Sequence, residues 1–184
     1  MHKLTRRNII ATMTSSTVLL CPRILGAQTV DLDWNGIATD TPVGMDALFE
    51  LPAGPGTVDI SALSPGDVAV IARPSNEGEF SATGQVDYIA VLHRTDAQIA
   101  AAQATGQAIT TQNPAYLVVS LVCPHRGKAV GMTGDPALPF ACTDRRSRHS
   151  SVFDVAGTGV SGASEKEKMK VPNYTLEGTA LTLA

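Results

Sequence analysis

Cysteine and histidine are scarce in this chain of 184 residues, which contains three cysteines and four histidines. Beyond the N-terminal segment, the only cysteines are Cys123 and Cys142. His125 and His149 lie in the same two short segments, so each segment offers one thiol and one imidazole. Because soft ligands are concentrated in this way, the pattern indicates a metal site.

Basic residues are outnumbered by acidic ones. The chain has 14 lysines and arginines against 17 aspartates and glutamates, which gives a formal net charge of -3. Residues 1–27 hold four of the cations and no acid, so the net charge of the remainder falls from -3 to -7. Nucleic-acid binding depends on cations that neutralise phosphates, and an acidic protein of this size is therefore not expected to bind nucleic acid.

The N-terminal region lacks an apolar run long enough to span a membrane. The run at 11–20 is interrupted by threonines and serines and is well short of the ~20 residues that cross a bilayer. Arg6 and Arg7 precede it, as in a twin-arginine export signal, and Ala27 ends a plausible cleavage site. We expect residues 1–27 to be an export signal and the protein to be periplasmic. The alternatives are an ordinary Sec-type signal or an uncleaved segment that anchors the protein at the inner membrane.

Charged residues make up only 17% of the chain, which also has 16 glycines and 11 prolines. This composition favours a loop-rich β protein, and the length predicts one domain. Runs of alternating or continuous apolar residues between turn signals predict strands at 57–60, 68–71, 86–93 and 117–122, and a closing hairpin at 171–176 and 180–183. Residues 28–56 are expected to be an irregular lead-in.

A short helix is expected between the third and fourth of these strands. Thr95 and Gln98 have the spacing of a capping box that opens a helix running to about Ala104. The strand at 117–122 ends directly before Cys123, which places this cysteine at the start of a loop.

The residues around the two cysteines form two motifs. The first is Cys-x-His-x-Gly, at Cys123, His125 and Gly127. The second begins at Cys142 and continues with His-Ser-Ser-Val-Phe-Asp at 149–154. Together they resemble the two loops of Rieske iron–sulfur proteins, which read Cys-x-His-x-Gly and Cys-x-x-His-x-Ser.

The resemblance covers about residues 57–184. It implies an all-β fold of antiparallel sheets or a small barrel, with a short inserted helix and a two-loop cluster-binding subdomain. It also implies a [2Fe–2S] cluster with one iron bound by Cys123 and Cys142 and the other by His125 and His149. By the same resemblance the hydroxyl of Ser151 contacts a bridging sulfide, and His93 is a non-ligand that lies on the surface or packs against neighbours.

The chain departs from the family in the length of the second loop. Six residues, 143–148, separate Cys142 from His149 where the family has two. The family register is kept after His149, which indicates an insertion within the loop rather than loss of the ligand. Lengthening a loop costs little closure entropy, under about 1 kcal/mol for a doubling.

Other departures affect the expected potential. Lys128 stands where high-potential Rieske proteins have a disulfide-forming cysteine, so we expect the cluster alone to hold the loops together. Phe153 replaces a tyrosine whose hydroxyl contacts a cysteine sulfur in the family, and a lost hydrogen bond to sulfur lowers the potential. The family's proline-containing loop is here Ser161 to Ser164, which we expect to be looser.

These features predict a periplasmic electron-transfer protein, or a subunit of a respiratory oxidoreductase. The resemblance points to quinol–cytochrome c reductase and to molybdenum enzymes of the arsenite oxidase kind. The partner would be a cytochrome or a larger oxidoreductase subunit. Five cations near the ligands could form a docking patch or could be solvated loop residues: Arg126, Lys128, Arg145, Arg146 and Arg148. Nothing in the sequence supplies the iron-bearing second domain of a Rieske oxygenase.

Two other arrangements of the same residues remain open. Cys123 and Cys142 could form a disulfide, as in many exported proteins. Two cysteines and two histidines could also bind a tetrahedral zinc ion. In either case the protein would be a Rieske-fold domain that has lost its cluster and acts as a binding or structural module.

Overall fold

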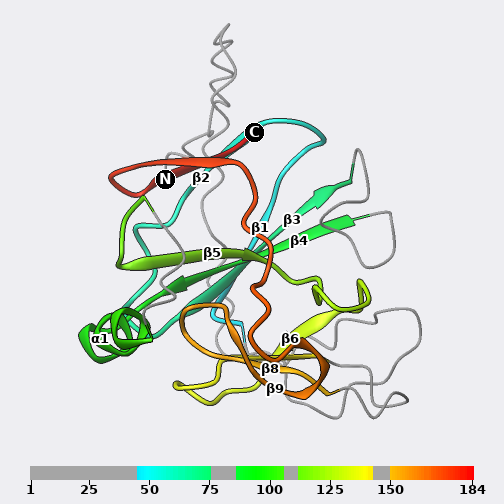
Figure 1. Cartoon of the computed structure of the whole chain (residues 1–184). Helices are drawn as coiled ribbons and strands as arrows, with labels where there is room; N and C mark the ends of the chain where they lie inside the picture. The colour runs from blue at the N-terminus through cyan, green and yellow to red at the C-terminus, as the bar shows by residue number, and fades with distance from the viewer. Residues whose placement is uncertain (1–44, 76–85, 106–111, 143–149) are drawn as a thin grey trace, which may run out of the picture.

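We describe residues 45–75, 86–105, 112–142 and 150–184 of a computed structural model of the chain. Its largest sheet has four strands in the order β1-β3-β4-β5. These strands are β1 (Ala47–Glu50), β3 (Val68–Pro74), β4 (Val86–His93) and β5 (Tyr116–Ser120). Strands β3, β4 and β5 pair antiparallel, whereas β1 pairs parallel with β3. The sheet crosses the middle of the molecule (Figure 1).

Each face of the large sheet supports a hydrophobic core. Neighbouring side chains in a strand point to opposite faces, and alternate residues of β3 and β4 accordingly belong to different cores. Val70 and Leu92 pack with Phe140 and Phe153 in the first core. Ile71 and Ile89 pack in the second core, with the hydrophobic residues Val58, Leu181 and Leu183. Burial on both faces explains why these strands are almost continuously apolar.

The second core is covered by a three-stranded antiparallel sheet in the order β10-β11-β2. Its strands are β2 (Gly56–Asp59), β10 (Tyr174–Glu177) and β11 (Ala180–Leu183). Gly178 has a φ of +60° at the hairpin turn, a conformation that favours glycine. This sheet lies above the large sheet in Figure 1, where β10 and β11 are red.

The first core is covered by a sheet of four short strands in the order β6-β7-β8-β9. They are β6 (Val130–Met132), β7 (Phe140–Cys142), β8 (Val152–Phe153) and β9 (Gly159–Ser161), followed by the 3-10 turn η1 (Gly162–Ser164). We call this sheet with its connecting segments, residues 121–142 and 150–169, the loop subdomain. It holds the first motif and the described part of the second, and it lies below the large sheet in Figure 1.

The helix α1 (Asp96–Ala104) follows β4, as predicted. The Thr95 hydroxyl accepts from the backbone N–H of Gln98 at 3.3 Å, and Gln98 Oε1 accepts from the N–H of Thr95 at 2.8 Å. The predicted capping box is therefore confirmed. Gln98 also donates from Nε2 to the carbonyl oxygen of Pro136 at 2.7 Å, so the helix start is joined to the loop subdomain.

The expected fold class is confirmed in its coarser form. The described residues form β-sheets with one short α-helix, but the described strands make three open sheets and not a closed barrel. Strand β1 lies inside 28–56, for which the sequence predicted irregular structure, and its parallel pairing with β3 departs from the expected antiparallel sheets. The predicted export signal at 1–27 lies outside the described residues. No helix in the described ranges is long and apolar enough to cross a membrane.

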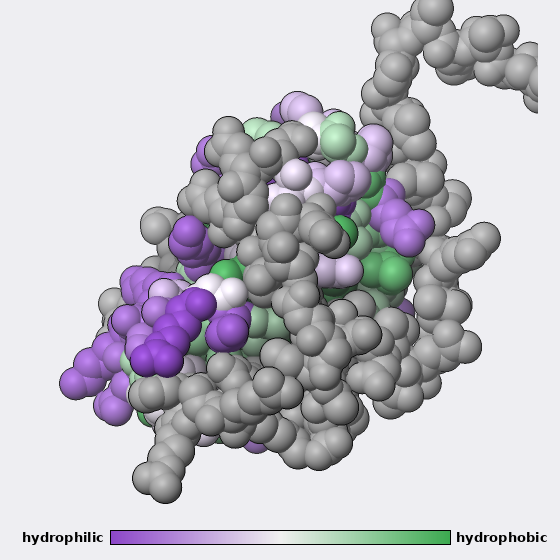
Figure 2. Space-filling model, turned by 90° about the vertical axis from the view of Figure 1, so that its right-hand side faces the viewer, coloured by the Kyte–Doolittle hydropathy of each residue, from purple (hydrophilic) through white to green (hydrophobic). Residues whose placement is uncertain are grey.

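Few large hydrophobic side chains are exposed in the described ranges. On the face in Figure 2, hydrophilic side chains predominate, and hydrophobic residues show in a smaller area. Within the described ranges, the exposed large hydrophobic residues are Val160 and Val171.

Candidate metal centre

The first motif forms a tight loop at the end of β5. The backbone N–H of Cys123 donates to the carbonyl oxygen of Lys128 at 2.7 Å, and the N–H of Gly127 donates to the carbonyl oxygen of Cys123 at 2.9 Å. Gly127 has a φ of +64°, which the turn requires and most other residues avoid. These bonds fold the backbone around the Cys123 thiol, which is buried, and place His125 half-buried in the same loop.

The described ends of the second motif are joined to each other in the loop subdomain. Cys142 ends β7, and its N–H donates to the carbonyl oxygen of Ser151 at 2.8 Å. A backbone hydrogen bond therefore connects the two ends of the segment that separates Cys142 from Ser151. The inserted residues and His149 lie outside the described residues, so the predicted role of His149 stays a prediction.

The two loops bring the cysteines into contact. The hydrogen bond with Cys142 lowers the pKa of Cys123 to about 5. Burial opposes this shift, whereas Ser164 and the backbone N–H groups of His125 and Arg126 add to it. Both cysteines are free thiols. Since the thiolate is the form that binds metals, the surroundings of Cys123 favour the ligating state at neutral pH.

A third segment, η1, lies where the resemblance places the family's proline-containing loop, and it completes the surroundings of Cys123. The Oγ of Ser164, in η1, lies 3.4 Å from the Sγ of Cys123, and the N–H of Ser164 donates to the Oγ of Ser151 at 2.9 Å. Both serines are fully buried. Ser164 is 41 positions from Cys123, so no local pattern in the sequence could have revealed this contact.

This third segment packs closely against its neighbours at two glycines, and its expected looseness relative to the family's loop stays a prediction. A Cβ on Gly162 would lie 1.8 Å from the carbonyl oxygen of Ser150, and one on Gly159 would lie 1.8 Å from that of Ser164. Only glycine permits such close approach of two backbones. The N–H of Lys166 donates to the carbonyl oxygen of Gly159 at 2.8 Å, which fastens the turn.

The predicted site residues are therefore partly brought together. Cys123, Cys142 and Ser151 converge, and His125 shares the loop of Cys123. His93 lies at the end of β4, stacks on Tyr116 with ring centroids 4.6 Å apart and has Nδ1 2.8 Å from the carbonyl oxygen of Leu63. His93 thus packs on a neighbouring strand of the large sheet, as expected of a packing residue.

The described donors fit one half of a [2Fe–2S] centre. Two converging thiols, one of them with a lowered pKa, are the donors that the two-cysteine iron requires. In the described ranges no group of three or more histidine, cysteine or acidic residues is placed to hold a metal ion. The second histidine of the predicted set, His149, lies beyond those ranges.

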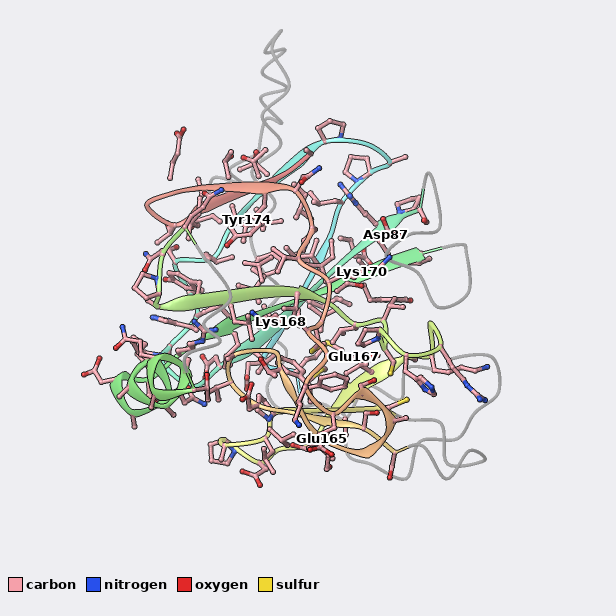
Figure 3. All side chains as sticks on the ribbon, in the orientation of Figure 1. Asp87, Glu165, Glu167, Lys168, Lys170 and Tyr174 are labelled. Carbon is pink, nitrogen blue, oxygen red and sulfur yellow. The ribbon has the colours of Figure 1, made fainter. Side chains whose placement is uncertain are left out.

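The surroundings of the site are charged. Arg126 and Lys128 are exposed on the first loop, and the three other predicted cations, Arg145, Arg146 and Arg148, lie outside the described residues. The segment after η1 carries Glu165, Glu167 and Lys168 at the end of the loop subdomain and then Lys170, and it continues to β10 (Figure 3). These four residues are exposed, as expected of a mixed-charge surface.

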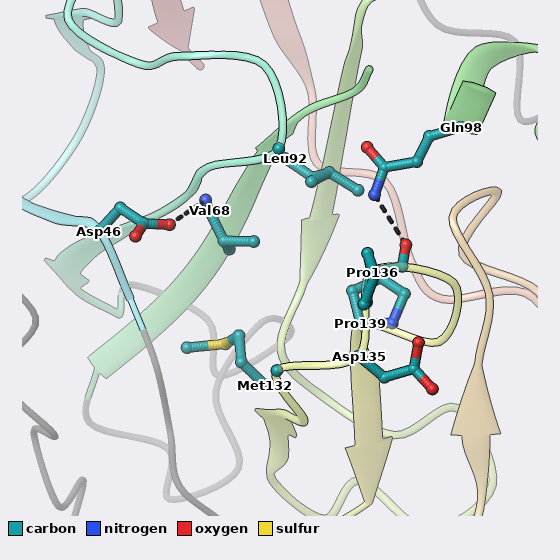
Figure 4. A pocket seen from close by; sticks show the side chains of 10 residues that line it. Asp46, Val68, Leu92, Gln98, Met132, Asp135, Pro136 and Pro139 are labelled. Atoms are coloured by element: carbon teal, nitrogen blue, oxygen red, sulfur yellow. Dashed lines mark hydrogen bonds between the residues drawn. The ribbon is translucent and has the colours of Figure 1, made fainter. Parts of the chain in front are cut away.

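A separate cavity of about 250 Å³ lies between the large sheet and the loop subdomain (Figure 4). Its lining includes none of the predicted ligands that the structure describes. Its polar side chains bond to the backbone: Asp46 accepts from the N–H of Val68 at 2.7 Å, and Asp135 accepts from that of Ala137 at 2.8 Å. The Asp46 bond joins two segments of the fold, whereas the Asp135 bond is local to its own loop.

Comparison of the chain with protein-family models and with curated protein sequences gives no match.

Proposed function

We propose that the protein is a periplasmic Rieske-type [2Fe–2S] electron-transfer protein, or the corresponding subunit of a respiratory oxidoreductase. The observation that supports this most is the convergence of Cys123 and Cys142 from two separate loops. Both cysteines belong to motifs that resemble the Rieske loops in sequence. The fold of sheets with one short helix agrees with this proposal.

Cys123 and Cys142 would bind one iron, and His125 and His149 the other. When bound, a [2Fe–2S] cluster accepts and releases a single electron. The residues of the chain hold the ligands in place: backbone hydrogen bonds fix Cys123 and Cys142, and Ser151 lies between the second cysteine and η1. The buried side chains of Phe140 and Phe153 belong to the same hydrophobic core as Cys123, and Cys142 packs against that core.

The electron would come from a reduced donor and pass to an oxidised acceptor protein, such as a cytochrome or a larger oxidoreductase subunit. The basic residues of the first loop would favour an acidic partner surface. A twin-arginine route, which exports folded proteins, would suit a cofactor that is assembled before export.

A second candidate is a cluster-free domain in which Cys123 and Cys142 form a disulfide. The contact between the two thiols favours this candidate too, because a disulfide requires the same proximity. A zinc ion on the same ligands would make the protein redox-inactive.

A redox titration separates these candidates. The cluster takes up one electron, and the ratio of its two states changes tenfold per about 59 mV; a disulfide takes up two electrons and changes tenfold per about 30 mV. We expect a reversible one-electron titration. The visible absorption of the cluster is the signal that monitors it. A two-electron titration of thiols, or no titration at all, would contradict the proposed function.

A further inference from the structure

We propose that Ser164 tunes the centre by donating a hydrogen bond from its hydroxyl to the sulfur of Cys123. The two atoms, Oγ and Sγ, are 3.4 Å apart, and both residues are buried. This inference rests on the proposed function, because it concerns Cys123 as a ligand.

The direction of the hydrogen bond follows from the chemistry of a ligand. A thiol and a hydroxyl can each donate to the other. A cysteine that binds iron does so as a thiolate and has no proton to donate. In the bound state the Ser164 hydroxyl is therefore the donor and the sulfur the acceptor.

The position of Ser164 is fixed from several sides. Its N–H donates to Ser151 Oγ at 2.9 Å, and its carbonyl oxygen accepts from the N–H of Glu167 at 3.0 Å. Gly159 packs against the same carbonyl so closely that a Cβ would collide with it. Because a fully buried hydroxyl needs a partner, this backbone anchoring keeps the Ser164 hydroxyl directed at the sulfur.

A hydrogen bond to a ligating sulfur stabilises the reduced form, which carries more negative charge. The hydroxyl that Phe153 lacks is thus replaced by one from a different part of the chain. The inference offsets the lower potential that the sequence analysis expects from the replacement of a tyrosine by Phe153. It also assigns a role to η1, where the family has a proline-containing loop.

The test compares Ser164→Thr with Ser164→Val in the full-length protein. The two substitutions add nearly the same volume, and only threonine keeps the hydroxyl. Ser161→Ala, an exposed position in the same segment, is the matched control. Each protein is titrated with dithionite as the reductant and ferricyanide as the oxidant, and EPR spectra and cluster content are recorded.

We expect the valine variant to have a lower midpoint potential than the threonine variant. At the same applied potential, its ratio of reduced to oxidised cluster should be roughly five to ten times lower, which corresponds to about 40 to 60 mV. The control should match the wild type. Equal potentials in the two variants, or equal loss of the cluster from both, would overturn the inference, because volume and not the hydroxyl would then matter. A wild-type protein without iron and sulfide would instead overturn the proposed function.

Discussion

Arg94 donates a hydrogen bond from its Nε to the carbonyl oxygen of Val155 at 2.8 Å, and so joins the large sheet to the loop subdomain. Its Nη1 also donates to the carbonyl oxygen of Pro114 at 3.1 Å. The side chain is buried, and this burial lowers the pKa of Arg94, while nearby Asp154 acts in the opposite direction. The buried guanidinium of Arg94 therefore connects the large sheet with the loop subdomain through hydrogen bonds.

We predict that Arg94→Lys destabilises the protein. A lysine keeps the charge but has no planar fork, so it cannot reach both carbonyl oxygens. A buried acceptor left without a partner costs about 1–3 kcal/mol, and we expect a loss of about 2–3 kcal/mol in the free energy of unfolding. Urea unfolding measures this, with the exposed Arg126→Lys as the control within about 0.5 kcal/mol of wild type. Identical urea midpoints for Arg94→Lys and the wild type would show that the two hydrogen bonds of Arg94 do not stabilise the protein.

A second prediction concerns Gly162 and Gly134, which have the same φ of +78°. An alanine at either position is strained by about 1–2 kcal/mol because of its φ. At Gly162 the Cβ would also collide with the Ser150 backbone, whereas Gly134 has nothing within 4 Å. We therefore expect Gly162→Ala to destabilise the protein more than Gly134→Ala and to reduce its iron content. Equal unfolding midpoints and equal iron content in the two variants would refute the close packing of η1.

The third prediction is that Ser151→Ala lowers the midpoint potential of the centre. The resemblance places the Ser151 hydroxyl on a bridging sulfide, and its Oγ also accepts the N–H of Ser164. The substitution removes both interactions, so we expect a larger fall than for Ser164→Val. A redox titration in which EPR spectra monitor the reduced centre measures the midpoint potential. A value equal to that of the wild type would mean that the inserted loop has displaced this segment from the centre.

Much of the fold could be predicted from the sequence because its signals are local. Strand β4 has the predicted bounds, 86–93, and α1 begins at the predicted capping box. The closing hairpin turns at Gly178, within the predicted turn. In each case apolar periodicity or a turn residue within a few positions determines the structure.

Features that depend on distant parts of the chain were not predicted. Strand β1 has four residues and takes its register from β3, so its own sequence gives little signal. The strands β8 and β9 are too short for alternation to be recognised. Of the candidate site, the cysteines and Ser151 could be predicted from motifs, but Ser164 could not, since it reaches Cys123 only through tertiary packing.

The fourth prediction concerns the basic residues near the ligands. If they form a docking patch, reduction or oxidation by the physiological partner should slow as salt rises, because exposed charges more than about 8 Å apart are largely screened at physiological ionic strength. Reversal of Arg145 and Arg146 to Glu should reduce the association rate much more than the rate within the complex. Stopped-flow measurements at two or more ionic strengths test both effects.

The matched control reverses Lys168 and Lys170 to Glu, which changes the net charge by the same amount on the segment between η1 and β10 (Figure 3). We expect this control to change the association rate less. A salt-independent rate together with equal effects of the two double substitutions would leave the basic residues as solvated loop cations.

The most direct test of the central claim is the iron and acid-labile sulfide content of the purified protein, measured with its EPR spectrum after reduction. We expect about two irons and two sulfides per chain. His149→Ala should abolish the cluster, whereas His93→Ala should keep it, because His93 stacks on Tyr116 away from the motifs. A protein that contains zinc without iron, or a disulfide between Cys123 and Cys142, would contradict the account.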